Sequence, residues 1–561
     1  MVKNKFEMRE KYQYSKNKQL LSLFSIWTSC NLNFLVVFRE VLLFVTGELK
    51  RLKNSYNLQS RYITKIGSGL HRENIVFTIN ELVKEFFNTY PFFEHEDKKF
   101  GKSKNFSHEQ LLSFIILCYF KEIRSYRKMS IRAKSNDEEI LFLLNTNTIS
   151  KSLISNFMNK YGFLFTDFLY FTVKKGLELN MISNEILSLD GTFISAYANK
   201  NRRISREEIK FLKKILQKLD FTNTKNKLHK NLKKYFNNPT DENKIKQVSS
   251  IVNNLNSDSI ELLKKGLKSI ESKNEIIDYL DEISSYHSPD TNFDINLTDP
   301  ESTFLPDKKG VKGYNFNFQV VTDSKNDMII TTSLVNDSND NKQLIPMIES
   351  SIMVLGEKPK FMVVDNGYYT YEALSYCIIN NIILIIPDKA EASRKKSNKS
   401  KNIYRKSNFV YDRINDTYTC VHGVKLYFKK IRGHGTTKSK VYTSDECKKC
   451  KYLKKCCKNN KREIIERTNP IIDHFKDIYY SDKGQKIYKK RANLSETIYA
   501  HLKEARNFNG LKRKGIEKCL IVLNIESTIH NIEKIHREKF SKNQNKKLKK
   551  YEQISLKIWK T

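Results

Sequence analysis

The chain has 561 residues, of which 100 are Lys or Arg and 62 are Asp or Glu, so its formal net charge at pH 7 is +38. This length allows roughly three or four domain-sized units, and a hydrophobic share of 39% permits a sizeable core. The nine cysteines are too few and too unevenly spaced for the disulfide framework of a secreted protein, which favours a reducing, cytoplasmic interior.

The positive charge is spread along the whole sequence rather than gathered in one tail. An excess of this size favours a polyanionic partner such as DNA, because each Lys or Arg placed on a phosphate releases condensed counterions. The alternative is an idle basic surface, since abundant Lys, Asn and Ile are also typical of an A/T-rich gene. The charge therefore predicts a nucleoid-associated protein without proving one.

Residues 1–70 form a basic leader with one apolar helix, "IWTSCNLNFLVVFREVLLFV", at residues 26–45. Arg39 and Glu40 interrupt this segment, which indicates a buried or partner-facing helix rather than a membrane span. Over residues 71–180 apolar side chains recur at helical spacing, as in "HEQLLSFIILCYFKEIRSY", which predicts an all-helical domain.

Strand-like texture then begins at "EILSLDGTFI" and is interrupted by a helical, densely charged insertion at residues 201–285. "YNFNFQVVTDSKNDMIITTSLVN" is typical of a β-hairpin, and it is followed by alternating predicted helices and strands as far as "IILIIP". A basic, cysteine-bearing insertion at residues 389–465 comes next, and the C-terminal part, 466–561, is helical from near Tyr479. Residues 181–200 and 286–388 together predict an α/β core whose sheet has mixed direction.

Asp190 closes a short apolar run and is followed directly by Gly191 and Thr192. The local pattern fits a strand that ends in an Asp-Gly turn, or a carboxylate held as a ligand. Asp365 repeats the pattern after its own apolar run. Because open α/β sheets place their sites at the carboxyl ends of strands, the two acids could meet there and share Mg²⁺ or Mn²⁺. Two such ions about 4 Å apart can clamp both oxygens of a phosphodiester exchange.

The late segment "YKKRANLSETIYAHLK" offers a third acid, Glu496. Its i, i+7 spacing from Lys503 predicts that both lie on one helix face, with Tyr488 and Arg491 one to two turns earlier. Such a helix could contact DNA in three ways. Its acid would bind a metal ion, its Arg and Lys would bind phosphate, and its Tyr would stack on a base. The alternative is a surface helix with ordinary charges.

Five segments taken in order resemble the DDE transposases of bacterial and archaeal insertion sequences, in the subgroup with a long helical insertion after the first Asp and a cysteine-bearing stretch before the last Glu. They are "LDGTFISAYANK", "DPEST" with "KGYNFNFQVVTD", "LVNDSNDNKQLIPMI", "VVDNGYYTYEAL" and "YKKRANLSETIYAHLK". The resemblance as a whole covers residues from about 75 to 535. Each segment alone is weak, whereas the ordered set is specific.

The resemblance implies a ribonuclease-H-like catalytic core, a requirement for two Mg²⁺ or Mn²⁺ ions, and cleavage of element ends followed by strand transfer into target DNA. It also implies a homodimer on double-stranded DNA, with residues 71–180 holding the terminal inverted repeats. It assigns the catalytic triad to Asp190, Asp365 and Glu496. Tyr488, Arg491 and Lys503 match the remaining positions of the family's Tyr-Arg-Glu-Lys signature, although the gap from Arg491 to Glu496 is one residue longer than its commonest form. A catalytically silent DNA-binding derivative and a nuclease without strand transfer are the alternatives.

The cysteine-bearing insertion supplies a Cys-x-x-Cys pair, Cys447 and Cys450, together with Cys420, Cys456 and Cys457. A pair with this spacing and two further thiolates is typical of tetrahedral zinc, which could fold a knuckle too small to fold unaided. We take Cys420, Cys447, Cys450 and Cys456 as the candidate ligands, with His422 and His434 as substitutes. The alternative is a set of reduced thiols in a basic loop.

Overall fold

The computed structural model describes residues 70–71, 73–90, 106–135, 137–145, 148–222, 226–237, 246–289, 293–306, 312–387, 403–412, 414–433, 438–467, 469–508 and 510–558. Within these, the side chains of residues 492–497 and 542–558, and a few others, are not described. The predicted apolar helix at residues 26–45 and the substitute ligand His434 lie outside the described residues. No helix of the described part is long and apolar enough to cross a membrane.

The chain divides into two compact units, one made of Met1–Arg72 with Ser135–Asn147 and one made of Glu73–Lys134 with Thr148–Thr561. In the first unit the structure describes one helix, α6 (Glu138–Leu144). All elements named below belong to the second unit.

The all-helical texture predicted for residues 71–180 is confirmed in the described residues. The helices of the second unit here are α3 (Ile75–Thr89), α4 (His108–Phe120), α5 (Tyr126–Ala133), α7 (Lys151–Lys160) and α8 (Leu164–Glu178). Helix α4 begins with a capping box, in which Ser107 and Gln110 satisfy each other's backbone N–H groups. Its residues from Leu111 to Tyr119 are buried, as expected for a helix that is apolar on all sides.

The central sheet is mixed, as the sequence predicted. Its strands are β1 (Ile186–Ser195), β4 (Thr303–Pro306), β5 (Lys312–Asp323), β6 (Ile329–Val335), β7 (Phe361–Val363) and β8 (Ile383–Ile385), in the order β4-β5-β1-β7-β8 with β6 also paired to β5. Strand β1 runs antiparallel to β5 and parallel to β7. The predicted hairpin is present as β5 and β6. Helices α14 (Leu344–Leu355) and α15 (Tyr371–Ile379) occupy their predicted places in the chain, and the short helix η4 (Asn366–Tyr368) follows β7.

The first insertion folds around a core of its own. Its elements are β2 (Arg203–Ile204), α9 (Arg206–Gln217), α10 (Lys227–Asn237), α11 (Lys246–Val252), α12 (Ser257–Gly266), α13 (Ile270–Ser285) and β3 (Ile295–Asn296), with β2 and β3 paired. Periodic Leu and Ile side chains from these helices form one hydrophobic cluster. The apolar stripe of each helix therefore faces its neighbours in the insertion, and the charges face solvent.

The cysteine-bearing insertion contains a second sheet, which the sequence did not predict. Its five strands are antiparallel, in the order β13-β12-β11-β10-β9. They are β9 (Val410–Asp412), β10 (Thr417–Thr419), β11 (Lys425–Arg432), β12 (Ser439–Thr443) and β13 (Glu463–Arg467), accompanied by η5 (Lys406–Asn408), η7 (Asp445–Lys449) and α17 (Leu453–Cys456).

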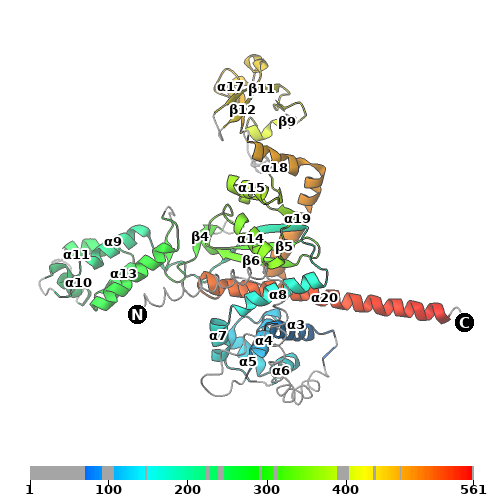
Figure 1. Ribbon diagram of the computed structural model, residues 1–561. Coiled ribbons are helices and arrows are strands. Elements are labelled where there is room, and N and C mark those ends of the chain that lie inside the picture. The colour runs from blue at the N-terminus through cyan, green and yellow to red at the C-terminus, as the bar shows by residue number, and fades with distance from the viewer. Residues whose placement is uncertain are drawn as a thin grey trace, which may run out of the picture. The chain divides into compact units, whose positions relative to one another are not determined.

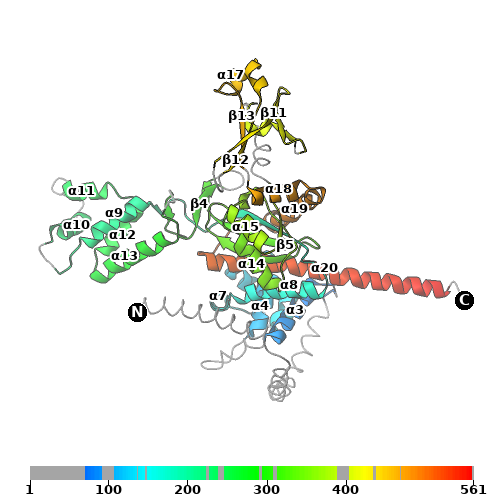
Figure 2. The same cartoon turned by 45° about the horizontal axis from the view of Figure 1, so that its top comes forward.

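The helical C-terminal part begins at Pro470, earlier than the predicted start near Tyr479. It contains α18 (Pro470–Tyr480), α19 (Asp482–Ala500), a π-helical turn η8 (His501–Ala505) and α20 (Ile516–Ile558). Helix α19 contacts β1, and α20 contacts β6. Helix α20 also packs along α8, as Figures 1 and 2 both show. Both faces of the central sheet are therefore covered by helices.

Candidate functional site

Asp190 lies within β1, where it is paired with Val320 of β5. The strand continues past it through Gly191 to Ser195. The interpretation of Asp190 as a turn residue is therefore wrong. Its side chain is only 15% exposed. A carboxylate this buried needs a positive charge or hydrogen-bond donors to compensate for its lost hydration.

Asp365 follows β7, the parallel neighbour of β1. Its backbone is extended, and its Oδ1 accepts a hydrogen bond of 2.7 Å from the backbone N–H of Gly367, which caps η4. Its side chain is 41% exposed. The two predicted acids thus come from adjacent strands at one edge of the sheet, as the strand order requires.

Arg491 of α19 joins the two carboxylates. Its Nη2 lies 3.0 Å from Asp190 Oδ1 and 3.8 Å from Asp365 Oδ2. Burial alone would lower the pKa of this guanidinium, but the two carboxylates outweigh burial and raise it. The acid pair is therefore compensated by a positive charge from within the chain.

Two more side chains tie the C-terminal helices to β1. The hydroxyl of Tyr499 donates a 2.6 Å hydrogen bond to the backbone carbonyl of Asp190, and burial, followed by the charge of Asp190, raises the pKa of Tyr499 well above its usual value. Lys503 Nζ donates to Thr192 Oγ1 at 2.8 Å and to the carbonyl of Phe193 at 3.0 Å. The backbone on both sides of Gly191 is thus held by hydrogen bonds.

Tyr488, the third predicted DNA contact, is half-buried and packs edge-on against Tyr479 at a centroid distance of 5.2 Å. Burial raises the pKa of its hydroxyl, while the neighbouring Arg491 opposes that rise. Its ring packs against the hydrophobic cluster beneath α18 and α19, and its hydroxyl lies close to Arg491.

Glu496 lies in α19, between Arg491 and Tyr499. Its side chain is outside the described part, so the third acid stays a prediction. The i, i+7 argument that placed it on one face with Lys503 assumed a regular α-helix, whereas Lys503 lies in the π-helical turn η8. A π turn rotates the residues after it relative to those before it, and such turns are frequent at functional sites.

Sequence reasoning missed Tyr499 as a residue of this site. The available signal was its position three residues after Glu496, which places both on one side of a helix. It also gave no role to Asp340, although "LVNDSNDNKQLIPMI" carried part of the resemblance.

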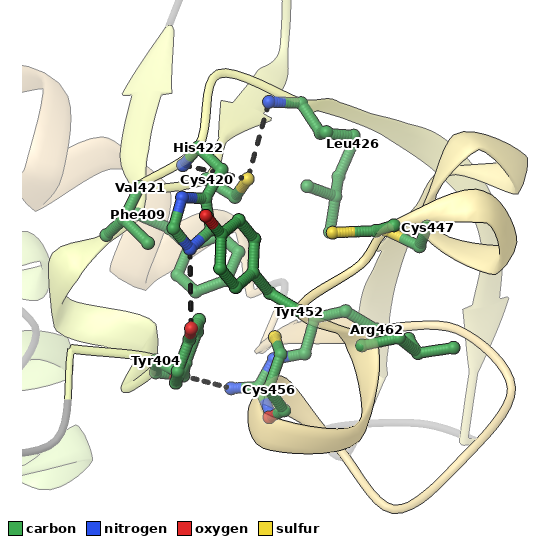
Figure 3. A pocket seen from close by; sticks show the side chains of 13 residues that line it. Tyr404, Phe409, Cys420, Val421, His422, Leu426, Cys447, Tyr452, Cys456 and Arg462 are labelled. Atoms are coloured by element: carbon green, nitrogen blue, oxygen red, sulfur yellow. Dashed lines mark hydrogen bonds between the residues drawn. The ribbon is translucent and has the colours of Figure 1, made fainter.

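The cysteine pocket is a small cavity beside the second sheet, shown in Figure 3. All four predicted ligands line it: Cys420, Cys447, Cys450 and Cys456. Cys457 is absent from this lining, and its Sγ instead donates to the carbonyl of Asn459 at 3.2 Å. The structure therefore separates the four candidate ligands from the fifth cysteine.

Two backbone N–H groups contact the sulfur of Cys420. The N–H groups of His422 and Val424 point at Cys420 Sγ, at 3.4 Å and 3.3 Å. Burial raises the pKa values of Cys447 and Cys456, and neighbouring thiols raise them further, while Arg462 opposes the rise. The imidazole of His422, the substitute ligand, instead stacks on Tyr452 at a centroid distance of 3.9 Å.

Among the residues that the structure describes, no three Asp, Glu, His or Cys side chains are grouped closely enough to hold a metal ion as they stand. At the acid pair, the guanidinium of Arg491 lies where the two carboxylates meet. At the cysteine pocket, the thiols surround a common space without converging on one point.

A comparison with protein families matches residues 419–536 to a family model described as "Transposase DDE domain". The matched segment contains the four candidate cysteine ligands and the helices that carry Tyr488, Arg491, Glu496 and Lys503. It supports a DDE transposase and is compatible with the mixed α/β core. No curated protein matches the chain.

Proposed function

We propose that this protein is a transposase that cleaves DNA at the ends of its own element and transfers the freed strands into target DNA. The observation that carries the proposal is the convergence of Asp190 and Asp365, delivered by two adjacent strands, on the guanidinium of Arg491. The family match over residues 419–536 supports the same reaction class independently, because it covers the helix of Glu496 rather than the two aspartates.

The donor set fits a hard divalent cation. Carboxylate oxygens are the ligands that Mg²⁺ and Mn²⁺ take from proteins, and Asp190 and Asp365 already share one positive charge in this structure. We propose that these two residues and Glu496 hold two ions. When bound, the ions would activate water and then a 3′-hydroxyl as nucleophiles and stabilise the charge of the phosphodiester transition state.

The chain's own residues have separate tasks in this proposal. Tyr499 fixes the backbone of Asp190, so the carboxylate keeps its position when DNA approaches. Arg491 presents a planar set of donors that suits phosphate as well as carboxylate, and Tyr488 lies beside it. Lys503 contacts β1 in this structure, so we propose that it positions the strand behind the site in addition to any phosphate contact.

The net charge of +38 supports double-stranded DNA as the partner. We propose that residues 71–180 contact the terminal inverted repeats, and that a homodimer brings the two ends together, because strand transfer needs both.

We propose Zn²⁺ as the occupant of the cysteine pocket, held by Cys420, Cys447, Cys450 and Cys456. Two features support this choice: the backbone N–H groups that point at Cys420 Sγ, and four thiols in mutual proximity that a cation would stabilise as thiolates. Its role would be structural, since four protein ligands leave no open position.

A strand-transfer assay tests the main proposal. The purified full chain is incubated with Mg²⁺, supercoiled target DNA and labelled duplexes that carry the inverted repeats flanking the gene. Joined products support a transposase, cleaved but unjoined ends indicate a nuclease, and salt-sensitive binding without cleavage indicates a silent derivative. Duplexes with scrambled repeats are the control for end recognition.

A further inference from the structure

Asp340 belongs to the loop between β6 and α14, and its carboxylate reaches the sheet beside the acid pair. Its Oδ1 accepts hydrogen bonds from two β5 amides, Asn317 Nδ2 at 2.8 Å and Gln319 Nε2 at 2.6 Å. Both amides are buried in β5, next to apolar side chains of the same strand. Both buried amides donate to this one carboxylate oxygen. A buried polar group without a hydrogen-bond partner would lower the stability of the folded state.

The two glycines that follow the proposed catalytic aspartates make room for this carboxylate. Neither Gly191 nor Gly367 has a positive φ angle, so backbone conformation does not explain the absence of a side chain. A Cβ atom at Gly191 would lie 2.5 Å from Gln319 Nε2 and 2.8 Å from Asp340 Oδ1. A Cβ atom at Gly367 would lie 3.2 Å from Asp340 Oδ2. Asp340 therefore fills the space between the segments that carry Asp190 and Asp365.

Gln319 extends this contact to the turn after Asp365. Its Nε2 donates to Asp340, and its Oε1 accepts a hydrogen bond from the hydroxyl of Tyr368. A carboxylate can only accept, so Asp340 forces the amide nitrogen toward itself and leaves the amide oxygen facing Tyr368. Tyr368 is fully buried, and burial and then the charge of Asp340 raise the pKa of its hydroxyl well above the usual value, so it remains a donor.

We propose that Asp340 is a positioning residue, which acts through Gln319 and Tyr368 to hold the Asp365 turn at a fixed distance from Asp190. This inference rests on the proposed function, since it gives the network a purpose at the metal-binding acids. In this proposal Asp340 is not itself a metal ligand. Outer partners that orient metal-binding side chains typically contribute about 10–100-fold to metal affinity.

Two variants at Asp340 separate the effect of its hydrogen bonds from the effect of its negative charge. Asp340→Ala removes the acceptor, whereas Asp340→Asn keeps an oxygen that can accept from both amides and removes only the charge. Gln319→Met keeps the carboxylate and the side-chain length but breaks the connection to Tyr368. Asp337→Ala is the matched control, because Asp337 lies in the same loop and pairs with Gln343 instead of the site.

The first measurement is amide hydrogen exchange of the peptide spanning residues 364–369 in the full chain without metal. We expect severalfold faster exchange in Asp340→Ala and Gln319→Met, and exchange close to wild type in Asp340→Asn and Asp337→Ala. Unchanged exchange in either of the first two variants would overturn the proposal. Melting temperatures measured alongside exclude global unfolding as the cause.

The second measurement is Mn²⁺ affinity by calorimetry, again without DNA. We expect a loss of about tenfold or more in Asp340→Ala and Gln319→Met and no more than a small loss in Asp340→Asn. Equal losses in Asp340→Ala and Asp340→Asn, with Gln319→Met unaffected, would make Asp340 a ligand and overturn the positioning role.

A wild-type chain that binds no Mn²⁺ at the acid pair would refute the proposed function rather than this inference. The exchange measurement, which needs no metal, would then decide alone whether Asp340 holds the Asp365 turn.

Discussion

The acid pair and the cysteine pocket differ in how their charges are balanced without a metal. Asp190 meets Arg491 from 301 positions away in the sequence, and the central sheet fixes that meeting. The cysteines lie in one local insertion, where burial raises the pKa values of Cys447 and Cys456, neighbouring thiols add to the rise and Arg462 opposes it. The acid pair is therefore balanced by a guanidinium of the chain itself, whereas we propose that zinc balances the thiolates of the cysteine pocket.

This difference has a consequence for folding. Parallel and antiparallel pairing with β7 and β5 holds Asp190 in place whether or not an ion is bound. The second sheet buries only a small cluster of aromatic and aliphatic side chains, among them Tyr418, Leu426 and Tyr442. A core of that size gains most from an added cross-link such as bound zinc.

The largest expected effect is on the second sheet. Replacing Cys447 and Cys450 together with Ser should remove stoichiometric zinc and destabilise residues 403–467, by up to about 10 kcal/mol if metal binding supplies most of the folding free energy there. Elemental analysis and limited proteolysis measure the two outcomes. Cys457→Ser is the matched control, because Cys457 is next to a candidate ligand but does not line the pocket. Protein that is purified without zinc and still protects this sheet would contradict the comparison.

The second effect concerns activity at the acid pair. Asp190→Asn should lower Mg²⁺-dependent DNA cleavage by at least about a thousandfold, since metal-ion stabilisation contributes several kcal/mol. DNA binding should be retained. The melting temperature without metal should fall modestly, because Arg491 loses the nearer of its two carboxylates.

The zinc content of Asp190→Asn should not change, which separates the two regions. Cleavage assays, filter binding and calorimetry decide these points. Substantial remaining cleavage by Asp190→Asn would refute its proposed role.

The smallest effect tests a second buried carboxylate, Asp299, which lies between β3 and β4. Asp299 is fully buried, and burial raises its pKa to about 6, although the backbone N–H of Gly515 donates to it at 3.1 Å and opposes the rise. A folded-state pKa above the unfolded value means that the folded state binds the proton more tightly. The stability contributed by protonated Asp299 is therefore present below about pH 4 and lost as pH rises through about 6.

Asp299→Asn should remove this pH dependence and make the chain more stable than wild type at pH 7.5, by at most about 3 kcal/mol. Urea unfolding between pH 4.5 and 7.5 measures the difference. Parallel curves for the two proteins would show that Asp299 is compensated after all, as Asp190 is.

The sequence was informative where periodicity was strong. The hairpin β5–β6, helices α14 and α15, and the meeting of Asp190 with Asp365 all follow from apolar patterns and from the position of each acid after its run. The second sheet was not predictable in this way. Strand β11 reads "KLYFKKIR", and seven of its eight side chains are exposed, so it lacks the alternation that marks a half-buried strand.

The role of Asp340 and the π-helical turn could not be predicted from the sequence either. Asp340 is an ordinary loop residue in the sequence, and its importance arises from the space left by two glycines in other segments. The π turn at His501–Ala505 has no distinctive composition, yet it determines where Lys503 points. Both features depend on tertiary contacts that local patterns do not encode.

The contacts between α19 and β1 indicate where the chain can be divided into two fragments. Arg491, Tyr499 and Lys503 bind β1 through side-chain contacts of their own. The covalent connector from β8 to α18, which contains the entire second sheet, is therefore not what aligns the two. Since closing a longer loop costs little additional entropy, the length of that connector can be changed at little cost. A chain divided there into two separately expressed fragments should reassemble through these three side chains and through the packing of α20 along α8 and β6.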